Sequence, residues 1–175
     1  MTTLIGARAE AVTPLVYVAL GSNLSGPLAQ LRQARRGLDA LGQVVSCSSL
    51  YRTTPVGGPV GQDDFLNAVA VLKPLADDPE TFLAQLLSLE ADQGRTREVR
   101  WDARTLDLDL LSWGERVLAT PDLTLPHPRL LTRAFVLAPL CEAAPTWRHP
   151  VTGQRACEVL RALPPEGIEK TTLRW

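Results

Sequence analysis

The chain has 175 residues, 45% of them hydrophobic, so it is long enough to form one domain with a substantial core. Its formal net charge of −1 excludes a global basic field that would attract nucleic acid or an anionic membrane. The three cysteines show no zinc spacing or pairing pattern, and no apolar run approaches the ~20 residues of a membrane span. We therefore expect a cytoplasmic protein with free thiols and no nucleic-acid or membrane partner.

Apolar periodicity and turn residues predict the elements of the first half of the chain. Residues 1–14 carry no periodicity and are expected to form a flexible extension before a single domain over 15–175. The predicted elements are a strand at 15–20, a helix at 27–41, strands at 44–51 and 65–72, and a helix at 79–92. The loop at 52–64 is long for a compact domain, which is typical of a segment that covers a binding site.

The second half is predicted to contain a long loop at 93–103, a strand at 105–113, a Pro-rich loop at 120–128, and helices at 130–143 and 154–162. The resulting order, β-α-β-β-α-β, is that of a ferredoxin-like split β-α-β sandwich. This α+β fold has a mainly antiparallel sheet with helices packed on it. The chain adds further helices at its C-terminal end.

The most informative feature is a pair of aspartates, Asp107 and Asp109, inside the apolar stretch 104–111. If this stretch is a strand, both carboxylates lie on one face and the leucines on the other. Carboxylates about 6–7 Å apart repel each other unless a positive charge lies between them, and magnesium is the simplest one. Spacing alone is equally compatible with a half-exposed strand that has a solvated acidic face.

An arginine cluster immediately precedes this pair. Its members are Arg95, Arg97, Arg100 and Arg104. Arginine is suited to bidentate contact with phosphate oxygens. Carboxylates that bind a metal, next to arginines that bind phosphate, indicate a phosphoryl-transfer site.

Six short motifs share their order and spacing with one enzyme family. They are Tyr17-Val-Ala-Leu-Gly-Ser-Asn23, Ser49-Leu-Tyr-Arg-Thr53, Phe65-Leu-Asn-Ala68, Gln93-Gly-Arg95, Arg104-Thr-Leu-Asp-Leu-Asp109 and Leu125-Pro-His127. Together they resemble the 6-hydroxymethyl-7,8-dihydropterin pyrophosphokinases of folate biosynthesis. The similarity extends from about Val16 to Pro150, and its most specific part is the fifth motif followed by the sixth.

The resemblance implies an enzyme, expected to be monomeric, that transfers the pyrophosphoryl group of ATP to the hydroxymethyl oxygen of the pterin with two magnesium ions. Asp107 and Asp109 would bind both ions, and Arg95 and Arg104 would act with them in catalysis. Nucleotide contacts are implied for Glu90, Arg95, Arg97, Trp101, Arg104, Thr124, His127 and Arg133. Pterin contacts are implied for Thr53, Thr54, Pro55, Val56, Phe65, Asn67 and Phe135.

The sequence departs from the family pattern at several positions. Thr54 stands where the family commonly has proline, and Phe65 where it often has tyrosine. Leu87 and Asp122 occupy positions where some members have polar or basic nucleotide contacts, and Pro128 replaces a frequent aromatic residue. None of these changes affects the aspartate pair or the arginine cluster.

Two other classes of function fit part of the pattern. One is a domain that only binds a ligand or nucleic acid, although RNA-binding sheets of this kind carry more exposed aromatic residues. The other is a metal-dependent nuclease or phosphatase that uses the same aspartates. The segment Gly21-Ser22-Asn23 could be mistaken for a phosphate-binding loop, but it lacks the lysine and second glycine. We expect it to form a tight turn between a strand and a helix.

Overall fold

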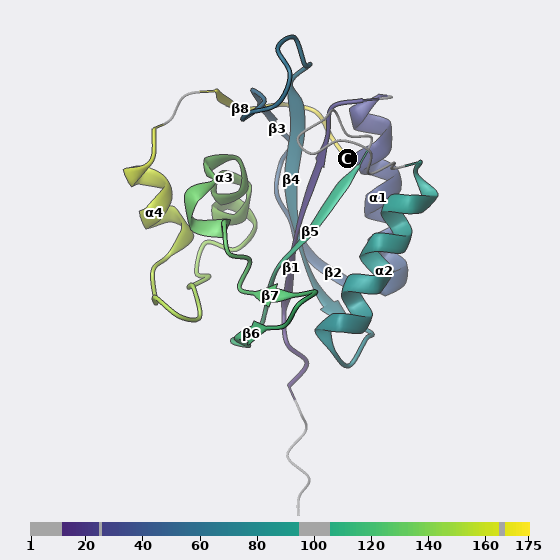
Figure 1. The fold of residues 1–175 in the computed structure, drawn as a ribbon, viewed down its shortest axis with the longest axis vertical. Helices are drawn as coiled ribbons and strands as arrows, with labels where there is room; N and C mark the ends of the chain where they lie inside the picture. The colour runs from purple at the N-terminus through teal and green to yellow at the C-terminus, as the bar shows by residue number, and fades with distance from the viewer. Residues whose placement is uncertain (1–11, 25, 95–105, 165–166) are drawn as a thin grey trace, which may run out of the picture.

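The structure is a computed structural model that describes residues 12–24, 26–94, 106–164 and 167–175. A six-stranded antiparallel sheet lies at its centre (Figure 1). Across the sheet the strands follow the order β5 (Asp107–Trp113), β1 (Val16–Ser22), β4 (Phe65–Pro74), β3 (Tyr51–Thr53) and β8 (Ile168–Lys170), while β2 (Gly42–Cys47) also pairs with β4. The predicted α+β class is confirmed.

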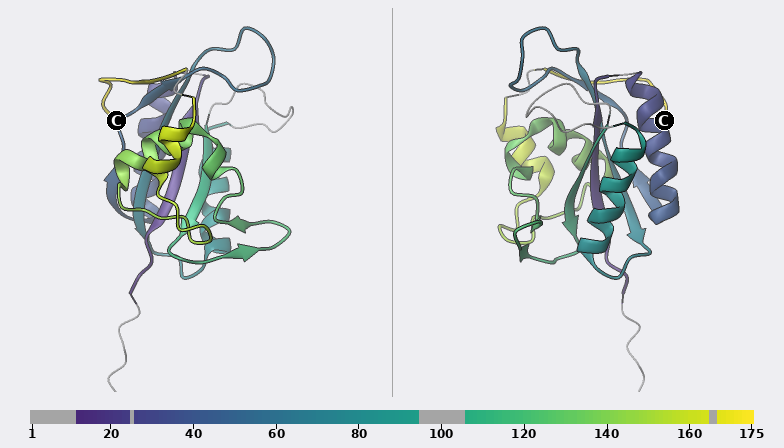
Figure 2. Two further views of the ribbon diagram at one scale, coloured as in Figure 1. Left: turned by 90° about the vertical axis from the view of Figure 1, so that its left-hand side faces the viewer. Right: turned by 45° about the vertical axis from the view of Figure 1, so that its right-hand side comes forward.

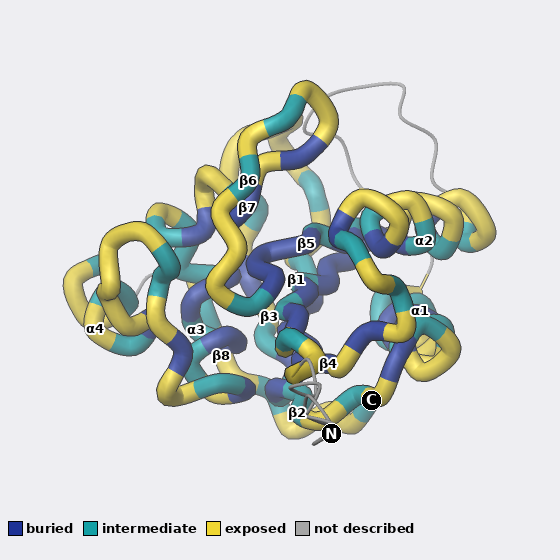
Figure 3. The backbone as a smooth tube through the Cα atoms, turned by 90° about the horizontal axis from the view of Figure 1, so that it is seen from below, coloured by how far each residue is buried: buried dark blue, intermediate teal, exposed yellow. Residues whose placement is uncertain are grey.

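Helices cover both faces of the sheet. Helices α1 (Pro27–Leu41) and α2 (Pro79–Asp92) lie side by side on one face, and α3 (Ala134–Ala143) and α4 (Ala156–Ala162) cover the other (Figure 2). A hairpin of β6 (Leu118–Ala119) and β7 (Thr124–Leu125), then the 3₁₀ helix η1 (Leu130–Thr132), connect β5 to α3. Viewed from below, the buried strands β1, β4 and β5 run between the two helical layers (Figure 3).

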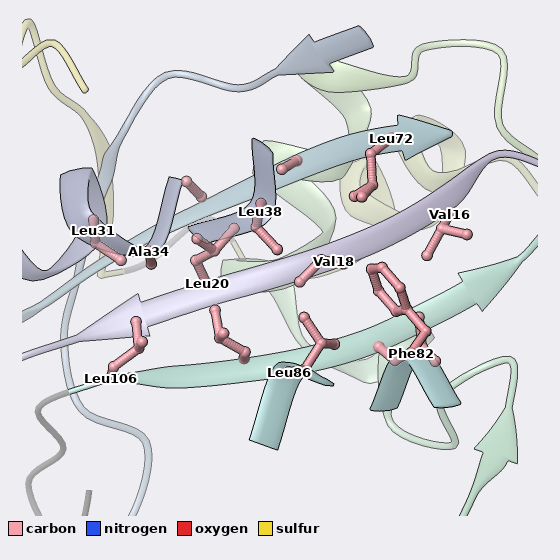
Figure 4. Packing of buried hydrophobic residues seen from close by; sticks show 14 of the residues in the cluster. Val16, Val18, Leu20, Leu31, Ala34, Leu38, Leu72, Phe82, Leu86 and Leu106 are labelled. Atoms are coloured by element: carbon pink, nitrogen blue, oxygen red, sulfur yellow. The ribbon is translucent and has the colours of Figure 1, made fainter. Parts of the chain in front are cut away.

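Each helical layer encloses its own hydrophobic core. Leu108 and Leu110 of β5 pack with Phe82 and the rest of the core under α1 and α2. Figure 4 shows Phe82 within this core. Because side chains alternate along a strand, Asp107 and Asp109 face the α3 layer instead. Leu111 continues this alternation and joins the core under α3, and the bulge at this point shifts the register so that Trp113 returns to the core under α1 and α2. The metal-ligand candidates are thereby placed on the more open face of the sheet.

The helices at 27–41 and 79–92 begin and end where the sequence predicts. Pro27 and Pro79 occupy the first helical position, where a missing N–H costs nothing. Asp78 caps α2, because its side chain accepts a hydrogen bond from the Thr81 N–H at 2.8 Å. These local patterns therefore determine the bounds of both helices, of which α1 packs on β1 and α2 packs on β5.

Other predicted elements differ from the structure. The strand expected at 44–51 is divided into β2 and β3, because Ser48 exchanges hydrogen bonds with the Val69 backbone through its own N–H and its hydroxyl. The helix expected at 130–143 is interrupted at Arg133, whose backbone is extended (φ −114°, ψ 99°). The strand expected to end at 20 continues to Ser22, so Gly21 lies in β1 and not in a turn. The short strands β6 and β8 were not expected.

The cysteines require a further correction. Cys141 of α3 and Cys157 of α4 form a disulfide, with their Cα atoms 5.1 Å apart, and Cys47 is a free thiol. The pairing follows from the packing of two helices, which the sequence spacing could not reveal. Since disulfides are rare in the cytosol, the cysteines no longer support a reducing compartment, and the cytoplasmic location stays a prediction. Within the described ranges, no helix combines the length and apolar character needed to cross a bilayer.

Candidate active site

The site begins with the two aspartates of β5. In the sheet register Asp109 lies opposite Ala19 and Asp107 lies opposite Gly21 of β1. These two partners are the smallest available residues, so the neighbouring strand leaves space beside both carboxylates. Both aspartates are partly exposed, whereas Leu108 between them is buried. The alternation predicted from the sequence is therefore present.

A cavity of about 290 Å³ opens on one side of the aspartates. All seven residues for which the resemblance implied pterin contacts line it, namely Thr53, Thr54, Pro55, Val56, Phe65, Asn67 and Phe135. They come from β3 and the loop that follows it, from β4, and from the start of α3. The fold thus brings together three segments that are far apart in the sequence.

The floor of this cavity is polar and closely packed. Asn67 and Thr53 are both buried, and the Asn67 side-chain amide donates a hydrogen bond to the Thr53 hydroxyl. Asn67 is also the register partner of Gly21. A Cβ atom at position 21 would lie 2.8 Å from Asn67 Oδ1, so only glycine leaves room for this side chain. Sequence reasoning missed the contribution of Gly21 because it assigned the residue to a turn.

A second cavity, of about 380 Å³, opens on the other side of the aspartates. Glu90 and Thr124, two of the predicted nucleotide contacts, line it, together with apolar residues of α2 such as Leu83. The two cavities share Asp107, Asp109, His127 and Pro128 as lining residues. Among the described residues, the aspartate pair and His127 therefore lie where the two cavities adjoin.

Glu90 is almost completely buried, with 2% of its surface exposed, although it is an acidic residue. Its Oε1 atom accepts a hydrogen bond from the Leu108 N–H at 2.7 Å. This N–H belongs to the edge strand β5 and lies between the two aspartates. Glu90 therefore fixes the backbone that carries the aspartates, in addition to lining the second cavity.

Arg133 supplies a positive charge beside the aspartates. Its guanidinium forms an ion pair with Asp109 (3.8 Å) and lies 5.6 Å from the centre of the Phe135 ring. The helix interruption at Arg133 makes this placement possible, since the residue precedes the first turn of α3. Arg133 lines the first cavity, between the aspartates and Phe135, although the resemblance implied a nucleotide contact.

His127 is held rigidly at the boundary of the two cavities. Its backbone N–H donates to the Leu111 carbonyl at 2.8 Å, and its Nδ1 atom accepts from the Arg129 N–H at 3.1 Å. Burial, together with the nearby charges of Arg133 and Arg129, lowers the pKa of His127 to about 4. Because Nδ1 accepts a hydrogen bond, the neutral ring carries its hydrogen on Nε2, which can donate to a phosphate oxygen.

The lowered pKa of His127 predicts a dependence of stability on pH. In the unfolded chain His127 binds a proton below about pH 6.5, whereas in the folded protein it does so only below about pH 4. The free energy of unfolding therefore decreases as the pH is lowered from 6.5 to 4. Replacing His127 by asparagine should remove that part of the loss, which urea unfolding of the ligand-free protein at pH 7.5 and 4.8 would measure. Burial also lowers the pKa of His149, so His149→Asn should reduce the loss with the same sign and provides the comparison with a histidine that lines neither cavity. An unchanged difference between the two pH values in His127→Asn would contradict the assignment.

Several predicted site residues lie outside the described residues. These are the arginines Arg95, Arg97 and Arg104 and the aromatic residue Trp101. Their predicted contacts, and the closure of the loop that carries them, stay predictions. The structure adds residues that the sequence analysis did not assign to a site, among them Ala19 and Arg129 in the first cavity and Pro121 in the second.

The donor groups at the aspartate pair fit magnesium. Hard divalent cations prefer carboxylate oxygens, and magnesium is commonly held by only one or two carboxylates together with substrate phosphates. Among the described residues there is no cluster of three or more histidine, cysteine or acidic side chains that could enclose a metal alone. Two carboxylates therefore suit a magnesium ion whose other ligands include substrate phosphates.

The chain is similar to proteins of one known family. The family described as 7,8-dihydro-6-hydroxymethylpterin-pyrophosphokinase (HPPK) matches residues 17–145. The 2-amino-4-hydroxy-6-hydroxymethyldihydropteridine pyrophosphokinase of Pseudomonas aeruginosa is 46% identical over 158 residues, which cover 89% of this chain and 95% of that protein. The protein of the same name from Haemophilus influenzae is 42% identical, over 73% of this chain and 80% of that protein.

Solved structures of HPPK-DHPS proteins share the fold. The structure from Plasmodium falciparum with pterin and p-hydroxybenzoate has a TM-score of 0.69 at 15% sequence identity, and the match covers 87% of this chain. This chain spans only 43% of that longer protein. At such low sequence identity the likeness supports the fold alone, whereas the family match and the relatives above establish the family. The chain belongs to the 7,8-dihydro-6-hydroxymethylpterin-pyrophosphokinase family.

Proposed function

We propose that this enzyme binds 6-hydroxymethyl-7,8-dihydropterin in the first cavity and ATP in the second, and transfers the pyrophosphoryl group of ATP to the pterin's hydroxymethyl oxygen. The observation that carries this proposal is the wall shared by the two cavities, which contains Asp107, Asp109 and His127. The phosphates of ATP bound in the second cavity would meet the hydroxymethyl group of a pterin in the first cavity beside these shared residues. Holding the two reacting groups in this way lowers the entropic part of the barrier.

The polar floor of the first cavity suits a pteridine ring. The Asn67 amide and the Thr53 hydroxyl together offer hydrogen-bond donors and acceptors to the nitrogen-rich edge of the ring. Phe135 provides an aromatic surface for stacking, and the guanidinium of Arg133 beside it is close enough to reach a phosphate placed at Asp109. Phe65 contributes a ring without the hydroxyl that the family often has there.

For the metal ions we propose Asp107 and Asp109 as shared ligands of two magnesium ions. When bound, these ions would neutralise charge on the β- and γ-phosphates. Glu90 keeps the backbone between the two ligands in place through its hydrogen bond to the Leu108 N–H. His127 would donate from Nε2 to a phosphate oxygen, and Arg95 and Arg104 would stabilise charge on the transferred group and on the departing AMP.

No residue needs to act as a general base in this proposal. A loose transition state requires little deprotonation of the attacking hydroxyl, and the described histidine at the site is a hydrogen-bond donor with a low pKa. Turnover should therefore rise only gently with pH between about 6.5 and 9. A steep rise that a single histidine or glutamate substitution abolishes would contradict this part of the proposal.

Product analysis tests the proposed function directly. With MgATP and the pterin, the enzyme should release AMP in a 1:1 ratio to pterin diphosphate, and removal of magnesium with a chelator should stop the reaction. Release of ADP would indicate a kinase that transfers one phosphoryl group, and pterin-independent release of phosphate would indicate a phosphatase. We expect the active species to be a monomer, which light scattering of the working solution would show.

A further inference from the structure

The C-terminal segment 167–175 runs along the edge of the sheet beside β3 and lies beyond the residues matched by the family. Strand β8 pairs with β3 in antiparallel register (Figure 1). Past β8, the Thr171 N–H donates to the Leu50 carbonyl at 2.9 Å, and the Trp175 indole N–H donates to the Ser48 carbonyl at 2.9 Å. The segment is therefore hydrogen-bonded along the whole length of β3.

The contact at the start of β8 reaches the first cavity. The Thr54 N–H donates to the Gly167 carbonyl at 3.0 Å, and Thr54 is the first residue of the loop that lines the cavity. Gly167 has a left-handed backbone (φ 74°), and a Cβ atom there would overlap the Thr54 hydroxyl. The position of Gly167 and the position of Thr54 therefore depend on each other.

A second contact joins β8 to the opposite wall of the cavity. Glu142, in the last turn of α3, accepts hydrogen bonds from the hydroxyls of Ser49 (2.7 Å) and Tyr51 (2.6 Å) and forms an ion pair with Lys170 of β8 (3.1 Å). A negative charge at a helix C-terminus is unfavourable on its own, so these three donors stabilise it. One carboxylate thus ties α3, whose first turn carries Phe135, to β3 and β8.

We propose that residues 167–170 are a positioning element of the pterin cavity, which sets the location of Thr53 and Thr54 and thereby determines pterin affinity without touching either substrate. This inference rests on the proposed function. None of the residues that line the second cavity belongs to β3, β8 or α3. Nucleotide binding should therefore be independent of the segment, and this separates a positioning role from a general contribution to stability.

The test compares two glycine variants, Gly167→Ala and Gly153→Ala. Both glycines have a left-handed backbone (φ 74° and 71°), but a Cβ at 153 meets no atom within 4 Å, whereas a Cβ at 167 meets Thr54. Binding of the pterin, and separately of a non-hydrolysable ATP analogue with magnesium, would be measured by calorimetry. In Gly167→Ala the Kd for the pterin should rise roughly tenfold, the loss expected for a misplaced hydrogen-bonding group. The Kd for the analogue should stay within about twofold of wild type, and Gly153→Ala should change neither.

A second variant, Glu142→Gln, keeps the side-chain size but weakens the tie between α3 and β8. It should also raise the Kd for the pterin. If Gly167→Ala does not fold, Glu142→Gln serves as the test in its place. An unchanged pterin Kd in the folded variants, or an equal rise in both Kd values with a loss of Tm, would overturn the positioning role. Failure of the wild-type enzyme to bind the pterin at all would instead overturn the proposed function, and this inference with it.

Discussion

Replacing Asp107 or Asp109 by alanine is expected to reduce pyrophosphoryl transfer by roughly a thousandfold or more, because each change removes a proposed ligand of both magnesium ions. The fold should survive, since both carboxylates are partly exposed and neither belongs to a hydrophobic core. Steady-state rates with MgATP and pterin, together with thermal unfolding, would measure both effects.

The matched control for these variants is Asp77→Ala, because Asp77 is exposed in the turn before α2 and lines neither cavity. It should leave turnover and Tm close to the wild-type values. Near-normal turnover in either Asp107→Ala or Asp109→Ala would show that the metal assignment is wrong. A large loss of Tm in both would show that the pair has a structural role that the register does not reveal.

Gly21→Ala is expected to weaken pterin binding by roughly a hundredfold, because the new methyl group would displace Asn67 from the floor of the first cavity. Its Cβ would lie 2.8 Å from Asn67 Oδ1, and Asn67 is enclosed by Gly21 on one side and Thr53 on the other. The KM for ATP should change little, since Gly21 does not line the second cavity. Initial rates with each substrate varied in turn would separate the two constants.

Gly37→Ala provides the matched control for Gly21→Ala. A Cβ at position 37 of α1 would meet the flexible end of Leu89, and neither residue lines either cavity. We expect it to leave both KM values unchanged. Equal increases of both KM values in Gly21→Ala, or no increase in either, would contradict the placement of Asn67 at the pterin.

The aspartate pair and the two long helices could be predicted from the sequence because each depends on local physics. Alternation along β5 places Asp107 and Asp109 on one face, and proline at the first helical turn marks the start of α1 and α2. The segments around the first cavity could be assigned through their resemblance to a family, but residue spacing alone left an acidic surface strand as an equal alternative.

The features that could not be predicted depend on contacts between distant segments. The role of Gly21 follows from its two strand partners, and the disulfide follows from the packing of α3 on α4. Arg133 was expected on a continuous helix, yet an extended backbone at this residue turns it toward Asp109. Strand β8 has only three residues, too few for a recognisable alternation in the sequence, and it forms by pairing with the distant strand β3.

Metal binding tests the central claim most directly. The number of Mn²⁺ ions bound in the presence of a non-hydrolysable ATP analogue can be counted by electron paramagnetic resonance for the wild-type enzyme and for the Asp107→Asn/Asp109→Asn double variant. We expect about two ions per chain in the wild type, and the loss of at least one, with weaker analogue binding, in the double variant. The same number of ions, bound with the same affinity in both proteins, would contradict the proposal that the two aspartates bind the metals between the two cavities.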